Sequence, residues 1–363
     1  GGNIQADLSQ AVPMISGTID TGVFPVDSFM GASGSGANSD VRWSREAIDF
    51  SWMKQLALNL DITSQNISYQ SWSFTNAKFG LELANNTLSI PNWSAGFFGG
   101  TSAANLSVNG PSSEGQPAKI SGGLQLDNVG LQPLISSFTG VPLVQSNGTT
   151  DFEASINTSG VSIAAFIYGL NGDGSIDGDD ITIKGIDVAD LSRAASRTDS
   201  LGRQAEALFK TGIRGGSSEF DKLTGEFTIR EGVVNFDPLL LAGKDADVTT
   251  TGDVSLPAWT IDMRSAIQLH VDSDAEVPPP IEVSYRGSLS NPSTSFAQEA
   301  IQNFISQKVQ SKVQDLIKDK VDGELGGVLN NIIGGKNSND NQEGGAQQRQ
   351  QEPLQGILKN LIK

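Results

Sequence analysis

The chain has 363 residues, of which 41 are Gly and none is Cys, and 37% of its residues are hydrophobic. The absence of Cys excludes disulfides and cysteine nucleophiles, and a net charge of −17 argues against a nucleic-acid partner, because phosphate groups would be repelled. No segment of the sequence approaches the roughly 18 uninterrupted apolar residues that a membrane-spanning helix needs.

Residues 1–40 are predicted to be the end of an upstream module followed by a flexible linker. The chain starts in mid-sequence, without a charged start and an apolar centre like those of a signal peptide, so we expect sequence upstream of it. Residues 31–40 consist mostly of Gly, Ser, Ala and Asn, a composition typical of flexible linkers.

From residue 41 to residue 295 the sequence predicts short antiparallel strands. Leu58, Leu60 and Ile62 alternate with polar residues, and a period of two indicates a strand with one apolar face. Asn85-Asn86 is typical of a hairpin turn, and Gly99-Gly100 predicts another. The strands are therefore expected to form a meander.

The clearest alternation lies between residues 220 and 264. Phe227 and Ile229 alternate with charged and polar residues, Gly232 is expected to form a turn, and Asp237-Pro238 is expected to form the next corner. This pattern predicts a sheet whose apolar face must be covered by something.

Three helices are predicted among the strands. Helical spacing occurs at 131–138, where Gly140 ends the helix, and at 162–168. Residues 189–210 are expected to be mainly helical and polar. They are interpreted as a solvated connecting segment, and a basic functional site is the alternative.

The C-terminal part is predicted to leave the sheet after Asn291-Pro292. Ser295 and Gln298 can form a capping box for a long amphipathic helix over residues 296–321. Residues 322–363 are predicted to be a low-complexity tail with a short amphipathic segment from Pro353, which would need the sheet, a partner or a membrane surface to stabilise it.

A calcium loop is the most tempting alternative site. Asn171, Asp173 and Asp180 fall at ligand positions of an EF-hand loop, but Gly169 occupies the first position and strands flank the segment. An acidic hairpin turn is the competing interpretation. The only histidine, His270, lacks the nucleophile and orienting partner of a catalytic triad, so we expect it to be a solvent-exposed loop residue, and we expect neither enzymatic activity nor a cofactor.

Several segments resemble the C-terminal region of the AsmA family of Gram-negative bacteria, in the expected order between residues 40 and 320. They read WSREAIDFSWMKQLALNLDIT (43–63), LQLDNVGLQPLISSFTGVPLVQSNGTTDFEASINTSGVSIAAF (124–166), ITIKGIDVADL (181–191), FDKLTGEFTIREGVVNFDPLLLAGKDADVTTTGDVSLPAWTIDM (220–263) and PPIEVSYRGSLSNPS before the last long helix. The resemblance implies a mainly β fold, in which a long curled antiparallel sheet forms a taco-like groove with an apolar concave face, a few short helices and the long C-terminal amphipathic helix.

The resemblance further implies a periplasmic protein, held in the inner membrane by an N-terminal anchor outside this sequence, that lets phospholipids pass to the outer membrane and supports its integrity. On this interpretation acyl chains would lie against inward-facing side chains, although ordinary core packing is the alternative for each one. The expected contacts are Leu58, Phe79, Leu81, Leu124, Leu126, Phe152, Ile156, Phe227, Ile229, Ile261 and Met263. A second hypothesis is a scaffold that aids outer-membrane protein assembly without carrying lipid, with an outer-membrane or periplasmic protein docked at the C-terminal helix.

Overall fold

The computed structural model describes residues 1–28, 42–113, 115–139, 146–184, 186–196, 215–272, 276–297, 303–304 and 307. Residues 1–309 form one compact unit, and residues 310–363 belong to a second. The predicted linker at 31–40, the low-complexity tail and most of the predicted helix at 296–321 lie outside the described residues, although Asn303, Phe304 and Gln307 are helical.

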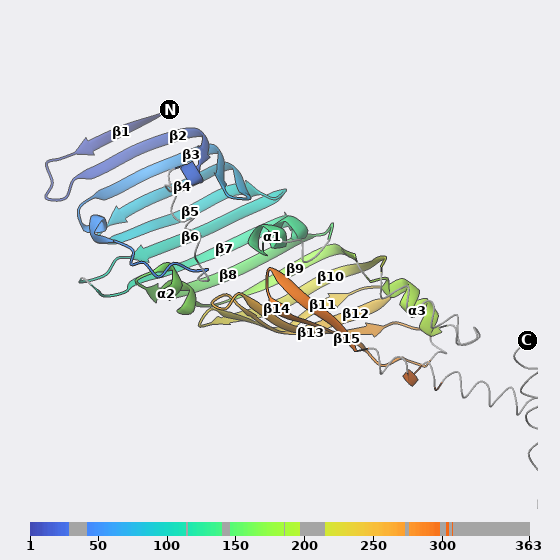
Figure 1. Cartoon of the computed structure of the whole chain (residues 1–363). Coiled ribbons are helices and arrows are strands. Elements are labelled where there is room, and N and C mark those ends of the chain that lie inside the picture. The colour runs from blue at the N-terminus through green and yellow to red at the C-terminus, as the bar shows by residue number, and fades with distance from the viewer. Residues whose placement is uncertain are drawn as a thin grey trace, which may run out of the picture. The chain divides into compact units, whose positions relative to one another are not determined.

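A single sheet of fifteen strands dominates the fold, and its spatial order is the order of the sequence (Figure 1). The first and last strands do not pair with each other, so the sheet is open, and the predicted mainly β class is confirmed. The strands are β1 Gly2–Asp7, β2 Met14–Pro25, β3 Ala57–Tyr69, β4 Trp72–Ala84, β5 Thr87–Phe97, β6 Gly100–Asn109, β7 Ala118–Gly130, β8 Thr149–Gly160, β9 Asn171–Lys184, β10 Ser217–Arg230, β11 Val233–Ala242, β12 Ala246–Ser255, β13 Thr260–Leu269, β14 Ile281–Ser288 and β15 Asn291–Ala297.

The N-terminal strands belong to the same sheet as the later strands, because β1 pairs with β2 and β2 pairs with β3. β2 pairs with β3 in parallel, with Ile15 opposite Leu58 and Ile19 opposite Ile62, whereas all other neighbouring strands of the described sheet are antiparallel. A parallel pair needs a long crossover, and residues 26–56 provide it.

The short helices lie at the ends of the strands (Figure 1). α1 (Leu131–Thr139) and α2 (Ile163–Tyr168) confirm two predicted helices, and α3 (Val188–Ser196) confirms the described part of the third. Ser162 caps α2 by accepting a hydrogen bond from the Ala165 N–H. Two 3-10 turns lie at Val26–Ser28 and Ser51–Lys54.

The strand ends form two rims, because neighbouring strands from β3 onward run in opposite directions and β2 starts on the same side as β3. The α1/α3 rim contains α1, α3 and the turns between β3–β4, β5–β6, β11–β12 and β13–β14. The α2 rim contains α2, the β1–β2 turn and the turns between β4–β5, β6–β7, β10–β11, β12–β13 and β14–β15.

The turn predictions are confirmed where left-handed backbone was expected. Asn85 (φ 50°) and Asn86 (φ 62°) connect β4 to β5, and Gly232 (φ 75°) follows Glu231 between β10 and β11. The turn expected at Gly99-Gly100 lies one residue earlier, because Phe98 (φ 44°) and Gly99 (φ 89°) form it and Gly100 already begins β6.

Three predicted turns or strand ends are wrong. Asp237-Pro238 lies inside β11 as an irregularity, where the register shifts between Phe236 and Leu239; a proline without an N–H fits a bulge of this kind. The acidic segment 171–180 is not a hairpin turn but part of the central strand β9, paired on both sides. Asn291-Pro292 does not end the sheet, since it begins β15, and Ser295 therefore lies in a strand rather than at a helix cap.

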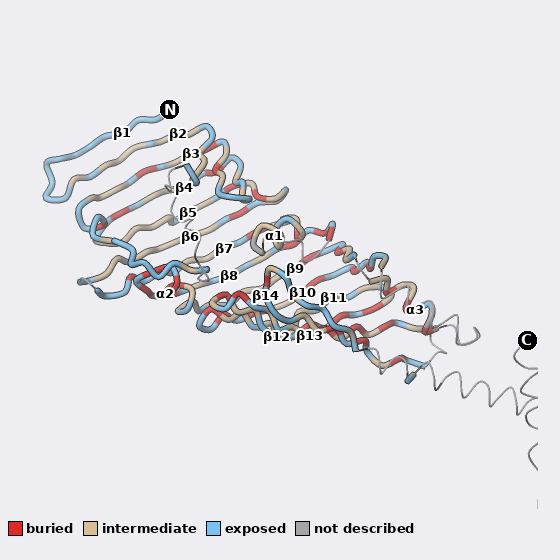
Figure 2. Tube along the Cα trace, in the orientation of Figure 1, coloured by how far each residue is buried: buried red, intermediate tan, exposed pale blue. Residues whose placement is uncertain are grey.

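Buried residues occur along the sheet from β3 onward, and the largest buried cluster lies in its C-terminal half (Figure 2). The largest buried cluster joins α3 to the strands from β9 to β14, for example through Leu191, Leu223 and Val283. α3 is also fixed by a hydrogen bond from Ser192 Oγ to the His270 carbonyl. By contrast, β1 and β2 contain no buried residue.

Residues 42–56, here called the strap, follow the α2 rim from the β12–β13 turn towards the start of β3. Near its beginning, Trp43 Nε1 donates to the Leu256 carbonyl at 2.8 Å, and the Arg42 guanidinium lies 3.5 Å from the Trp259 ring centroid. Further along, the Ile48 N–H donates to the Val161 carbonyl at 2.8 Å, and Lys54 Nζ to the Ser112 carbonyl at 3.1 Å. The strap therefore ties distant strand ends together.

Candidate functional site

One face of the sheet is apolar from end to end. Strand pairing aligns a single row of residues across β3 to β15, and most other apolar residues of these strands lie on the same face at two-residue steps. The row consists of Ile62, Phe79, Trp93, Ala104, Leu124, Ala154, Gly174, Phe227, Phe236, Gly252, Met263, Tyr285 and Thr294.

All eleven predicted contact residues lie on this apolar face. Phe79, Leu124, Phe227 and Met263 belong to the row itself. The others stand an even number of residues from it along their strands: Leu58, Leu81, Leu126, Phe152, Ile156, Ile229 and Ile261. Alternation therefore assigned the face correctly, although it missed Trp93, whose position follows a register shift in β5.

The eleven residues differ in how accessible they are. Leu126, Phe227 and Ile229 are only 3%, 6% and 7% exposed, so the chain's own atoms leave them little surface for a ligand. Leu124 is 38% exposed, because its register partners are the small residues Ala104 and Ala154. The remaining seven are half-buried: Leu58, Phe79, Leu81, Phe152, Ile156, Ile261 and Met263.

Accessibility of the apolar face differs along the sheet. From β5 to β8 the middle of the face is half-buried or exposed, as at Ile90, Leu106 and Ile156. Near β9 the face closes, because the rings of Phe152 and Phe227 stack 5.5 Å apart across the intervening strand. Beyond it, Val248, Ile267 and Val283 are buried towards the α1/α3 rim, whereas Phe236, Met263 and Tyr285 in the middle of the face are half-buried. Of the predicted contact residues, Leu124 on β7 is the most accessible.

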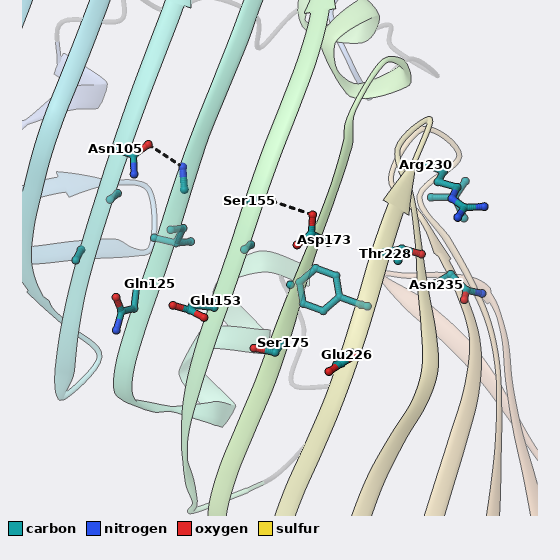
Figure 3. A pocket seen from close by; sticks show the side chains of 18 of the residues that line it. Asn105, Gln125, Glu153, Ser155, Asp173, Ser175, Glu226, Thr228, Arg230 and Asn235 are labelled. Carbon is teal, nitrogen blue, oxygen red and sulfur yellow. Dashed lines mark hydrogen bonds between the residues drawn. The ribbon is translucent and has the colours of Figure 1, made fainter.

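A hollow of about 1380 Å³ lies on the opposite, polar face of the sheet (Figure 3). Gln125, Glu153, Ser175 and Glu226 are register neighbours that alternate with the apolar row, and they line the hollow. Six residues of the row also border the hollow: Trp93, Ala104, Leu124, Ala154, Gly174 and Phe227. Of the predicted contact residues, only Leu124 and Phe227 are among its lining residues. The alternation of apolar and polar residues in the sequence predicts a groove on the apolar face. It does not indicate a hollow among the polar residues.

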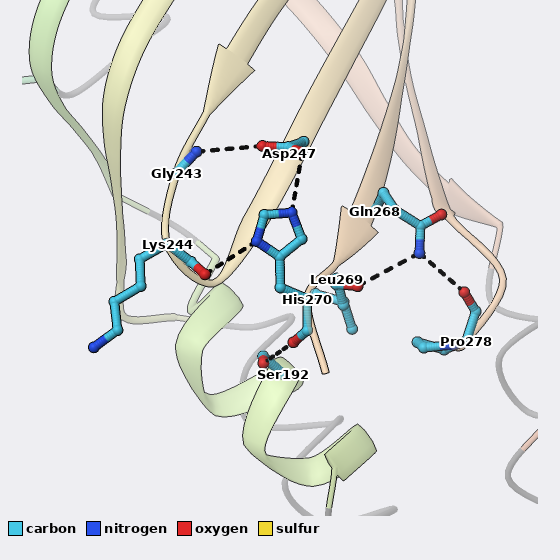
Figure 4. Close-up of polar contacts among 8 residues, drawn as sticks. All are labelled: Ser192, Gly243, Lys244, Asp247, Gln268, Leu269, His270 and Pro278. Carbon is cyan, nitrogen blue, oxygen red and sulfur yellow. Dashed lines mark hydrogen bonds and ion pairs between the residues drawn. The ribbon is translucent and has the colours of Figure 1, made fainter. Parts of the chain in front are cut away.

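His270 is exposed just after β13, as expected, but it is well connected (Figure 4). Its Nδ1 lies 3.0 Å from the Lys244 carbonyl oxygen and its Nε2 lies 3.0 Å from Asp247 Oδ2. The hydrogen bond to the Lys244 carbonyl and then the one to Asp247 raise the pKa of His270, because both oxygens favour the protonated ring. These contacts tie the end of β13 to the β11–β12 turn.

The three residues considered for calcium are spread along β9. Asn171 and Asp173 face the same side, and Asp180 (φ 54°) lies seven residues beyond Asp173, about 23 Å away in an extended strand. This extended geometry cannot wrap the three side chains around one ion as the loop interpretation required. Within the described residues, no group of three or more His, Asp and Glu side chains is arranged to hold a metal ion.

Helices in the described part of the chain are too short or too polar to cross a bilayer.

The profile of the AsmA family matches residues 31–239, which is more than half of the chain. The chain belongs to the AsmA family. No curated protein and no solved structure matches it.

The AsmA match differs in extent from the resemblance inferred from the sequence. It covers the middle of the chain, beginning inside the predicted linker and ending in β11, and does not reach residue 320. The expected assignment to the C-terminal region of the family is therefore not supported by the position of the match. Much of the open apolar face, on β3 to β8, falls within the matched residues.

Proposed function

We propose that this AsmA-family chain binds phospholipid acyl chains on its open apolar face and carries them, without catalysing a reaction, across the periplasm between the inner and outer membranes. The observation that supports this proposal best is the half-exposed apolar surface of β2 to β8. Each methylene that moves from water onto such a surface contributes about 0.8 kcal/mol when fully buried, so long acyl chains need no specific polar contact.

The open region narrows the set of contact residues. Leu58, Phe79, Leu81, Leu124 and Ile156 retain accessible surface. The buried residues Leu126, Phe227 and Ile229 act instead as the core that shapes the end of this surface.

Leu124 and Leu240 provide a matched pair for the test. Leu124 is 38% exposed on the apolar face, and Leu240 is 41% exposed on the polar face of β11. We expect phospholipid to co-purify with the wild-type chain and with Leu240→Glu, and to be lost from Leu124→Glu, because a carboxylate on the apolar face would have to be desolvated by an acyl chain.

Native mass spectrometry and lipid extraction measure this, and circular dichroism confirms that both variants fold. Absence of lipid from the wild-type chain, or equal loss from both variants, would overturn the proposal.

The alternative is a scaffold that assists outer-membrane protein assembly. The dense packing of β10 to β14, where Ile267 and Val283 are 5% and 0% exposed, supports it for that part of the sheet. A lipid-free wild-type chain would favour this second candidate.

A further inference from the structure

Exposed apolar side chains gather along one rim of the sheet. Among the described residues, fourteen large hydrophobic side chains are exposed, and eight of them lie on the α2 rim whereas two, Tyr69 and Val277, lie on the α1/α3 rim. The eight are Leu8, Val12, Met14, Ile48, Trp52, Val161, Ile163 and Tyr168. We call them the rim patch.

Backbone contacts hold much of the rim patch in place. The Ile48 N–H donates to the Val161 carbonyl, and the Ala164 N–H donates to the Ser44 carbonyl at 2.9 Å, so the strap and α2 form one surface. At the other end, the Ala57 N–H donates to the Pro13 carbonyl at 2.9 Å and joins the β1–β2 turn to the end of the strap.

The charge of this surface differs from that of the chain. The strap carries three basic side chains, Arg42, Arg45 and Lys54, against two acidic ones, Glu46 and Asp49, a net charge of +1. Residues 8–13 and 161–170 carry no charge, whereas the whole chain carries −17. The segments that carry the rim patch are therefore less acidic than the rest of the molecule.

We propose that the rim patch docks the protein on the surface of a phospholipid bilayer. A row of side chains along an edge suits an extended surface better than a pocket does, and Trp52 and Tyr168 have the amphipathic rings that favour the bilayer–water interface. The same rim borders the open strands β2 to β8, so docking would bring their apolar face next to the lipid. Docking itself does not depend on acyl-chain binding by that face.

The test is flotation of the full chain with vesicles of phosphatidylethanolamine and phosphatidylglycerol. We expect the wild-type chain to float, and Ile163→Glu combined with Tyr168→Glu to reduce vesicle partitioning about ten-fold or more, because two apolar contacts would be replaced by carboxylates. The matched control carries Tyr69→Glu and Val277→Glu on the opposite rim and should float like the wild-type chain. Added salt should not weaken flotation, since apolar insertion rather than charge attraction drives the docking.

Trp52→Ala provides a second variant if the double variant fails to fold, and it should also reduce partitioning. Failure of the wild-type chain to float, as expected if the patch binds a protein instead, would overturn the proposal, as would equal losses in the patch and control variants. Leu124→Glu should still float although it loses co-purified lipid, which separates this proposal from the proposed function.

Discussion

Gly174 shows how one missing side chain shapes the apolar face. It lies on β9 between Phe152 and Phe227, and a Cβ at this position would come within 2.2 Å of the Glu153 carbonyl oxygen and 2.4 Å of Phe227 Cζ. The absent side chain leaves room for the two rings to stack above the strand.

Replacing Gly174 with Ala should therefore destabilise the protein by about 1–3 kcal/mol, because the Phe227 ring must move out of its stacked position. Urea unfolding measures the change. Gly22→Ala is the control: a methyl group added at Gly22 would meet nothing within 4 Å, so the free energy of unfolding should change by less than about 0.5 kcal/mol. Equal effects of the two substitutions would contradict the stacking argument.

His270 should make stability depend on pH. Its pKa is raised above the ordinary value of 6.5, so its stabilising contribution is complete below that value and is lost as the pH rises through the raised pKa. Since both partners are substantially exposed, the loss between about pH 5 and about pH 8 should stay below about 1 kcal/mol. Thermal or urea unfolding across this range measures it, and His270→Asn should remove this component; an unchanged pH profile in the variant would rule it out.

From the sequence, the sheet face on which each predicted contact residue lies could be inferred, but its exposure to solvent could not. Period two placed all eleven contact residues on one face, because alternation is a local property of a strand. It could not show that Leu124 is exposed and Leu126 buried, since that depends on Ala104 and Ala154 on neighbouring strands.

The strap is the element that joins the two ends of the α2 rim. Trp43 anchors it by its hydrogen bond to Leu256 and by an edge contact with Trp259, whose ring centroid is 5.9 Å away. The strap begins at the β12–β13 turn and ends beside β2 and β3, so its anchor couples strands that are far apart in the sheet.

Trp43→Ala should destabilise the protein by about 2 kcal/mol or more, because it removes a hydrogen bond and an aromatic contact from a half-buried site. Hydrogen exchange should report the loss of protection at the β12–β13 turn and at α2. Trp52→Ala, at a 43% exposed position of the same strap, should leave the exchange of these segments unchanged. Comparable exchange in both variants would show that Trp43 is no anchor.

Among the elements, helices with clear spacing and caps were predictable, whereas breaks inferred from single dipeptides were not. Ser162 marked the start of α2 correctly. Asp237-Pro238 was expected to form a corner, but it is an irregularity inside β11, whose flanking residues Phe236 and Leu239 remain paired. Asn291-Pro292 was expected to end the sheet, but both residues pair with β14. The parallel pairing of β2 with β3 also escaped prediction, because it depends on where a long crossover returns.

At the scale of residues 1–309, the sheet combines an accessible part and a densely packed part in one continuous ladder. β1 and β2 contain no buried residue, while β10 to β14 enclose the main core together with α3. We expect β1 and β2 to open more easily than β10 to β14, since segments with few buried apolar contacts have the lowest local stability.

The strand order has a consequence for how the chain acquires its structure. Each strand lies beside its predecessor in sequence, and apart from the longer connections before β3 and β10 the connections are shorter, so little loop-closure entropy opposes the addition of most strands. A nascent chain emerging N-terminus first would find the partner of every new strand already in position, and assembly could advance like the stacking of repeats. The densely packed strands would be added late, completing the most stable part of the sheet after its accessible part has formed.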